Sequence, residues 1–140
     1  MQSLSRKHYT RPYMEIRKSS LPDAGYGVFA TDYISANTVM DEYKGKKVSV
    51  GENKDSAYLF AIPDHLGKIQ YMIDAEDVKK SNWTRFVNGA KTRKQRKQIN
   101  VEFVPGIGGK VYLQAFQDIC PGEEMICDYG SAYWKKSPVP

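Results

Sequence analysis

Few side chains of this sequence could serve as nucleophiles or metal ligands. The chain has 140 residues with 2 cysteines, Cys120 and Cys127, and 2 histidines, His8 and His65. Their number and spacing do not match the paired CxxC pattern of a structural zinc site, so we expect no metal. No serine or cysteine stands in a nucleophile context around either histidine, which leaves both with surface or packing roles.

Two short motifs have simpler structural explanations. Residues 106–110 read GIGGK, but Val111 stands where a phosphate loop needs Ser or Thr for Mg²⁺, so a hairpin turn is expected. Glu123 and Glu124 are adjacent, and neighbours in a strand point to opposite faces, so we do not expect them to work as a paired acid and base. Tyrosine is the conspicuous polar side chain, with 10 in the chain.

The charge is localised. The 21 Lys and Arg exceed the 16 Asp and Glu by 5. The whole excess comes from one seven-residue stretch without an acid, whose basic residues are Lys91, Arg93, Lys94, Arg96 and Lys97. The rest of the sequence has equal numbers of basic and acidic residues. The charge therefore disfavours a protein that wraps nucleic acid over its surface, and a basic arm or loop remains possible. No run approaches the ~20 apolar residues of a membrane span, and we expect a cytosolic or nuclear protein without a membrane partner.

Short alternating or apolar runs between glycine, proline and polar residues predict many short strands. We expect one short helix, beginning near residues 52–55, running through Phe60 and ended by Pro63. Pro121-Gly122 is typical of a type II turn. The expected strands cover residues 13–17, 28–30, 38–43, 69–73, 98–104, 110–116 and 124–128. This pattern favours a mainly β (α+β) domain built from small sheets.

Three segments carry a family resemblance. Residues 24–30 read AGYGVFA, residues 82–90 read NWTRFVNGA, and residues 121–130 read PGEEMICDYG. In this order, with YKG at 43–45 and IDA at 73–75 between the first two, they resemble the SET-domain protein lysine methyltransferases. The second segment is similar to the PR-domain branch, and the ending YGSAYW is closer to compact viral SET proteins.

The resemblance covers about Met14 to Trp134. It implies the SET fold: a mainly β (α+β) domain of several small sheets with a short helix and a threaded, pseudoknot-like C-terminal segment. The chain then divides into a flexible N-terminal arm (1–12), a SET domain (13–134) and a C-terminal tail (135–140).

The family transfers a methyl group from S-adenosylmethionine to a protein lysine. Only the neutral amine can accept the methyl group, and because the reference pKa of lysine is ~10.4, a narrow aromatic channel must desolvate it. The resemblance implies that Tyr129 is the catalytic tyrosine and that Tyr58 and Tyr133 line the lysine channel. It implies cofactor contacts by Gly25, Tyr26, Gly27, Arg85, Phe86, Asn88, Gly89 and Trp134. Phe29 and Phe86 also suit the hydrophobic core, which we favour for both.

Two departures from the family pattern matter. Gly89-Ala90 replaces His-Ser after Asn88, which removes a side chain but no backbone group and puts cofactor affinity in question. Cys127, two residues before Tyr129, occupies the position linked to the number of methyl groups added, and its small side chain predicts capacity for di- or trimethylation. Asn37 stands where the family often has a turn glycine, and asparagine tolerates the left-handed region.

The sequence therefore predicts an S-adenosylmethionine-dependent lysine methyltransferase acting on a histone tail or nucleosome, in the nucleus. An inactive SET-like binding module and a methyltransferase for a non-histone protein remain alternatives, although Tyr129, Tyr58 and Asn88 argue against the first. The stretch 91–97 is interpreted as a contact with DNA phosphate, a nuclear-import signal or a solvated loop, in each case away from the peptide path. The oligomeric state is open, a homodimer included.

Overall fold

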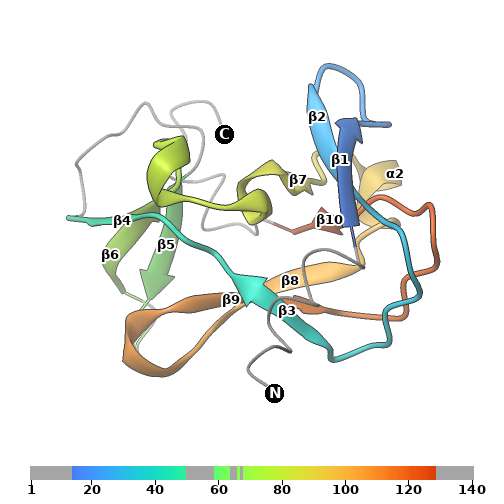
Figure 1. The fold of residues 1–140 in the computed structure, drawn as a ribbon. Helices are drawn as coiled ribbons and strands as arrows, with labels where there is room; N and C mark the ends of the chain where they lie inside the picture. The colour runs from blue at the N-terminus through green and yellow to red at the C-terminus, as the bar shows by residue number, and fades with distance from the viewer. Residues whose placement is uncertain (1–13, 50–58, 64–65, 67, 129–140) are drawn as a thin grey trace.

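The computed structural model describes residues 14–49, 59–63, 66 and 68–128. Within them, short strands form three sheets (Figure 1). β1 (Met14–Lys18) pairs antiparallel with β2 (Tyr26–Ala30), and β4 (Lys46–Val48), β6 (Ile69–Asp74) and β5 (Leu59–Pro63) form the order β4-β6-β5. The mainly β class and the small sheets predicted from the sequence are confirmed.

A five-stranded sheet contains the threaded segment. Its order is β3-β9-β8-β10-β7, built from β3 (Val39–Glu42), β9 (Val111–Ala115), β8 (Val101–Pro105), β10 (Ile126–Cys127) and β7 (Asn88–Gly89). β10 runs parallel to both of its neighbours, with Cys127 opposite Gly89 on one side and Val101 on the other. The C-terminal strand is thus inserted between two strands that precede it in the chain, beside the connection that joins them.

Short helical turns connect the strands. They are η1 (Val78–Lys80), η2 (Trp83–Phe86), α2 (Arg93–Arg96) and η3 (Ile107–Gly109). The connection expected at 105–109 is confirmed, since β8 and β9 are adjacent antiparallel strands. The turn before Glu123 is also confirmed, because Gly122 has φ +92° and the Glu123 amide donates to the Cys120 carbonyl at 3.1 Å. Asn37 adopts φ +73°, the conformation expected of it.

The predicted helix is wrong where it can be compared. Residues 59 and 60 begin β5, which pairs with β6 through Phe60 opposite Ile73 and Ala61 opposite Met72; the residues before 59 lie outside the described part. A short apolar run carries no periodicity that separates strand from helix, so the partner strand decides. The expected strand ends are wrong at 98–100 and 124–125, because regular pairing begins only at Val101 and Ile126.

The main core lies between β2, η2 and the five-stranded sheet. Its buried side chains include Val28, Met40, Val87, Leu113 and Met125. Phe29 is 5% exposed and Phe86 packs against this cluster, so the core roles favoured for both are confirmed. Burial alternates along β9, where Val111, Leu113 and Ala115 are fully buried.

Candidate active site

The glycine turn before β2 forms one side of the site. Gly25 has φ +73°, a conformation that glycine adopts without strain, and its carbonyl accepts from the Ser19 amide at 2.8 Å. Gly27 is glycine for another reason: an added Cβ would overlap the Glu124 carboxylate and crowd the Asn88 amide. The sequence had assigned both glycines to the approach of a cofactor, and the structure gives Gly27 a packing role as well.

Asn88 joins the glycine turn to the segment of η2 and β7. Its Nδ2 donates to the Tyr26 carbonyl at 2.9 Å and to Glu124 Oε2 at 3.3 Å. Two of the three motif segments, separated by more than fifty residues, therefore meet through the expected side chain. Both protons of the amide are directed into the protein, which leaves Oδ1 as the acceptor of this side chain.

Glu124 is the buried centre of this contact, at 9% exposed. Its carboxylate accepts from Ser19 Oγ at 2.7 Å, from Ser20 Oγ at 2.6 Å and from the Ser20 amide at 2.9 Å, in addition to Asn88. Glu123 is exposed, and its carboxylate accepts from the Cys120 amide at 2.6 Å. The two carboxylates thus point apart as expected, and the buried one acts as a hydrogen-bond hub.

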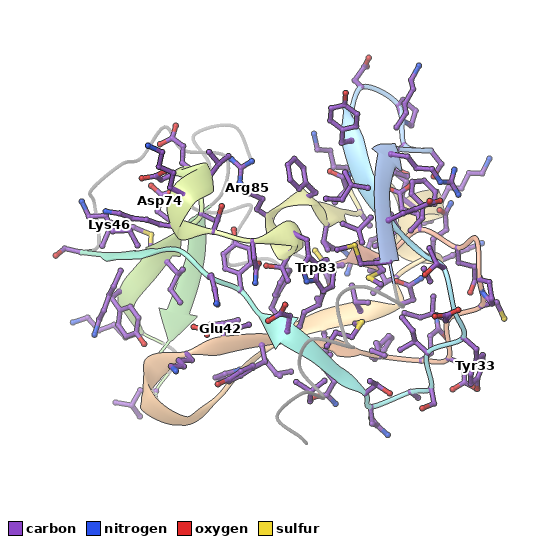
Figure 2. The ribbon with its side chains drawn as sticks, in the orientation of Figure 1. Tyr33, Glu42, Lys46, Asp74, Trp83 and Arg85 are labelled. Carbon is purple, nitrogen blue, oxygen red and sulfur yellow. The ribbon has the colours of Figure 1, made fainter. Side chains whose placement is uncertain are left out.

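The segment before Asn88 is fastened to β3. Trp83 Nε1 donates to Asp41 Oδ2 at 2.9 Å, and Asn82 Nδ2 donates to the Glu42 carbonyl at 2.9 Å. Asn82 also caps η2 by accepting from the Thr84 amide. Trp83 lies beside β3 in Figure 2. These contacts fix the position from which Val87 enters the core and Asn88 reaches Tyr26.

Arg85 points to the other side of η2. Its guanidinium donates to the carbonyls of Ala75 at 2.8 Å and Glu76 at 3.0 Å, and in Figure 2 it lies near Asp74. The contact links the two motif segments at 73–75 and 85–88, because Arg85 binds the backbone that directly follows Asp74. The described contacts make Arg85 a support of η2, a role that the sequence did not suggest.

Gly89 and Cys127 are opposite each other in the parallel pair β7 and β10. The Ala90 amide donates to the Cys127 carbonyl at 2.9 Å. Cys127 is fully buried and packs in the main core. Cys127, for which the resemblance implies a role in methyl number, is therefore held inside the five-stranded sheet.

The structure brings together Gly25, Tyr26, Gly27, Asn88 and Gly89, with Cys127 next to Gly89. Phe86 and Arg85 lie on the supporting side of η2. Tyr58, Tyr129, Tyr133 and Trp134 lie outside the described residues. Sequence reasoning missed Ser19, Ser20 and the hub role of Glu124, for which the only signal was the position of Glu124 inside the third motif.

The basic stretch forms α2 rather than an open loop. Thr92 and Gln95 make a reciprocal cap: the Gln95 amide donates to Thr92 Oγ1 at 3.1 Å, and Gln95 Oε1 accepts from the Lys91 and Thr92 amides. Arg96 makes a two-pronged ion pair with Asp128, with N–O distances of 3.2 and 3.0 Å. The pair lies at the end of the described chain, one residue before Tyr129.

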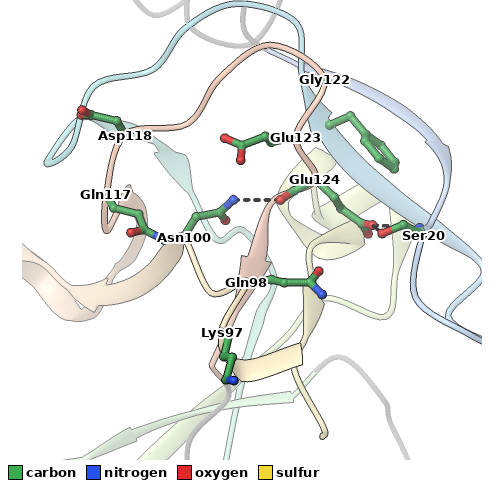
Figure 3. Close-up of a pocket in the computed structure, with 10 residues that line it drawn as sticks. Ser20, Lys97, Gln98, Asn100, Gln117, Asp118, Gly122, Glu123 and Glu124 are labelled. Atoms are coloured by element: carbon green, nitrogen blue, oxygen red, sulfur yellow. Dashed lines mark hydrogen bonds between the residues drawn. The ribbon is translucent and has the colours of Figure 1, made fainter. Parts of the chain in front are cut away.

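A polar cavity of about 370 Å³ is lined by Glu124 and its hydrogen-bond partner Ser20, together with Glu123 (Figure 3). Asn100 lines it and donates to the Glu124 carbonyl at 2.9 Å, and Gln117 donates to the Ile99 carbonyl. None of the described residues with an expected cofactor contact lines this cavity. A hydrogen bond to Asp118, another lining residue, raises the pKa of Tyr33 above its ordinary value.

The described residues contain no group of three His, Cys, Asp or Glu side chains that could hold a metal ion. They also contain no helix with the length and apolar character needed to cross a membrane.

Comparison with known proteins decides the family. The family model for the PR domain of PR domain zinc finger protein 2 matches residues 14–140. The chain belongs to the PR-domain family. The resemblance to SET-domain methyltransferases, and to their PR branch, is thereby confirmed, because PR domains are SET-like.

Relatives and solved structures agree with this assignment. The PR domain is 29% identical over 134 residues to histone-lysine N-methyltransferase set-17 of Caenorhabditis elegans, covering 94% of this chain and 46% of the relative. The methyltransferase domain of human PR domain-containing protein 2 matches with a TM-score of 0.69 and 26% identity, covering 86% of this chain and 81% of that one. A ctPRC2 structure bound to S-adenosylmethionine matches with a TM-score of 0.62 and 26% identity, covering 85% of this chain and 15% of that one. The chain thus spans less than half of its C. elegans relative.

Proposed function

We propose that this PR domain transfers methyl groups from S-adenosylmethionine to a lysine of a histone, in the nucleus. The observation that carries the proposal is the contact between Asn88 and the Tyr26 carbonyl, which joins the two motif segments expected to hold the cofactor. The name of the C. elegans relative supports the reaction and the substrate class. The S-adenosylmethionine in the ctPRC2 structure supports the methyl donor.

The described residues fit such a cofactor. Asn88 Oδ1 can accept from an ammonium group, because both amide protons are used within the protein. Gly25 and Tyr26 are exposed beside it, whereas Gly89 is buried opposite Cys127 in the β7 and β10 pair. S-adenosylmethionine supplies an electrophilic methyl group on a sulfonium. Tyr26, 63% exposed, offers an aromatic face next to this position.

The proposed role of the protein is to align the lysine amine with the methyl group and to remove water from the amine. Tyr58 and Tyr133 are proposed to enclose the lysine side chain, which favours its neutral form. Tyr129 is proposed to place its hydroxyl beside the amine and the transferred methyl group. Displacement at a methyl carbon is in-line, so holding the amine on the correct axis and excluding water supply most of the rate.

The proposal is tested by incubating the protein with labelled S-adenosylmethionine and either core histones or nucleosomes. Transfer of label to histone, with mass spectrometry locating the modified lysines, is the expected result. No transfer together with weak cofactor binding in calorimetry would instead favour a binding module, the alternative suggested by Gly89 in place of histidine. Transfer to non-histone proteins alone would refute the histone substrate.

The number of methyl groups follows from Cys127. Cys127 packs in the main core, and its small side chain two residues before Tyr129 is proposed to leave room for a methylated amine, so we expect di- and trimethyllysine at long reaction times. Intact-mass spectrometry of a histone H3 peptide would read the product state directly. A product that stops at monomethyllysine contradicts the prediction. Cys127→Phe adds bulk at this position and should shift the product toward monomethyllysine; because Cys127 is fully buried, urea unfolding of the same variant measures the stability lost by overpacking.

The exposed cations of the basic stretch are proposed to contact DNA phosphate on a nucleosome. Replacing Lys91, Arg93, Lys94 and Lys97 by glutamine should weaken nucleosome binding and reduce its dependence on salt. With fewer phosphate contacts, fewer counterions are released from the DNA on binding. Binding is measured by electrophoretic mobility shift at two salt concentrations. Methylation of a free peptide by the same variant should stay unchanged; equal losses on peptide and nucleosome would show that the stretch has another role.

A further inference from the structure

The stretch 91–97 is more than a charged surface, because it also holds the strand that leads to Tyr129. β10 lies between β7 and β8, and the residues from Ala90 to Asn100 connect those two strands around it. The Ala90 amide donates to the Cys127 carbonyl, and the Asn100 amide donates to the Ile126 carbonyl, both at 2.9 Å. Both ends of the connection are therefore fastened to β10.

Asn100 fixes the same strand through its side chain. Its Oδ1 accepts from the Ile126 amide and its Nδ2 donates to the Glu124 carbonyl, each at 2.9 Å, and it is 6% exposed. These contacts hold the backbone from Glu124 to Cys127. Asp128 follows this stretch directly. Its carboxylate binds the guanidinium of Arg96, which lies in the connection between β7 and β8.

The pair between Arg96 and Asp128 is suited to setting an orientation. Two parallel N–H···O bonds define the direction as well as the position of a carboxylate, which a single lysine contact does not do. α2 presents Arg96 rigidly, since the Thr92 and Gln95 cap closes its only turn. The two side chains are 50% and 35% exposed, so the pair is expected to add little to global stability.

We propose that Arg96 is a positioning residue for methyl transfer: by holding the Asp128 carboxylate it fixes the residue that directly precedes Tyr129 in the sequence. This inference rests on the proposed function, in which Tyr129 is the catalytic tyrosine. It distinguishes Arg96, which is paired with Asp128, from the exposed cations Arg93, Lys94 and Lys97. A small misplacement of a reacting group lowers the rate steeply, so even an exposed clamp can matter to catalysis.

Arg96→Ala is expected to lower kcat for a histone peptide roughly 10-fold, with cofactor affinity and peptide KM within about 2-fold. Arg96→Lys keeps the charge but loses the two-pronged hydrogen bonding, so its kcat should lie between those of the wild type and Arg96→Ala. Asp128→Asn should match Arg96→Ala, and the double variant should be no worse than either single one, because the same contact is lost. Glu15→Gln is the matched control; it breaks a different exposed ion pair, between Arg17 and Glu15, and should leave kcat unchanged.

Hydrogen exchange tests the clamp without relying on activity. In Arg96→Ala, the amide of Asp128 should exchange roughly 10-fold faster, whereas those within β10 and β9 keep their protection. Unchanged exchange at this amide, or an unchanged kcat in an active enzyme, overturns the inference. If the wild-type protein transfers no methyl group but the exchange changes as described, the proposed function fails and the structural clamp stands.

Discussion

Glu124→Ala is expected to lower the free energy of unfolding by about 2–4 kcal/mol, because it leaves several inward-pointing donors without their acceptor. The carboxylate accepts four hydrogen bonds, from Ser19, from the amide and hydroxyl of Ser20, and from Asn88. Without it, nothing holds the Asn88 amide against the glycine turn except the Tyr26 carbonyl. We therefore also expect S-adenosylmethionine affinity to fall ~10-fold, the size of one lost charge-assisted hydrogen bond.

The adjacent carboxylate provides the control for this prediction. Glu123 is exposed and its side chain accepts from the Cys120 amide, so Glu123→Ala should cost about 1 kcal/mol or less and leave cofactor affinity unchanged. Urea unfolding and calorimetric titration measure both quantities on the three proteins. Equal losses for the two variants would show that Glu124 is not a hub.

Gly27 offers an internal check on the same contact. A methyl group at this position would displace the Glu124 carboxylate, so Gly27→Ala should reproduce the loss of stability and of cofactor affinity. Adding Gly27→Ala to Glu124→Ala should cost much less than the sum of the two, because the overlapping carboxylate is already absent. Full additivity would place the two residues in separate roles.

Local patterns were sufficient for much of the fold. The alternation of Val111, Leu113 and Ala115 with more exposed residues identifies β9, and Pro121-Gly122 identifies the turn that reverses the chain before Glu123. The run 59–62 was misinterpreted because its strand character comes from pairing with β6 and not from its own periodicity. The insertion of β10 between β7 and β8 was expected only through the family resemblance, since two residues of strand carry no local signal.

The sequence predicted some contacts of the candidate site and missed others. Residue order in the motifs brought Gly25, Tyr26 and Asn88 together correctly. The hub at Glu124 depends on serines 105 and 104 residues earlier in the chain, and no spacing rule links them. The contact of Arg96 with Asp128 joins residues 32 apart, and the sequence treated Arg96 by its charge alone. Arg85 contacts the 75–76 backbone 9 and 10 residues before it, whereas the family resemblance implied a cofactor contact.

Tyr129→Phe is expected to reduce kcat for histone methylation on the order of 10²-fold or more, the usual effect of removing one preorganised polar group from an active site. The substitution removes a single oxygen and retains the ring, so packing around residue 129 should change little. Rates are measured with labelled S-adenosylmethionine at saturating peptide, and cofactor affinity is measured by calorimetry. Tyr33→Phe, which alters an exposed tyrosine outside the site, is the matched control and should retain wild-type rates.

The comparison of rate with affinity separates the enzyme from the binding module. If Tyr129 acts in the chemical step, the phenylalanine variant loses transfer but still binds S-adenosylmethionine within about 3-fold of wild type, because a group needed only in the transition state contributes little to ground-state binding. A parallel loss of both would assign Tyr129 to cofactor binding. Full activity of Tyr129→Phe would show that the Tyr129 hydroxyl is not needed for methyl transfer. The proposed role of Arg96 in positioning Tyr129 through Asp128 would then also be wrong.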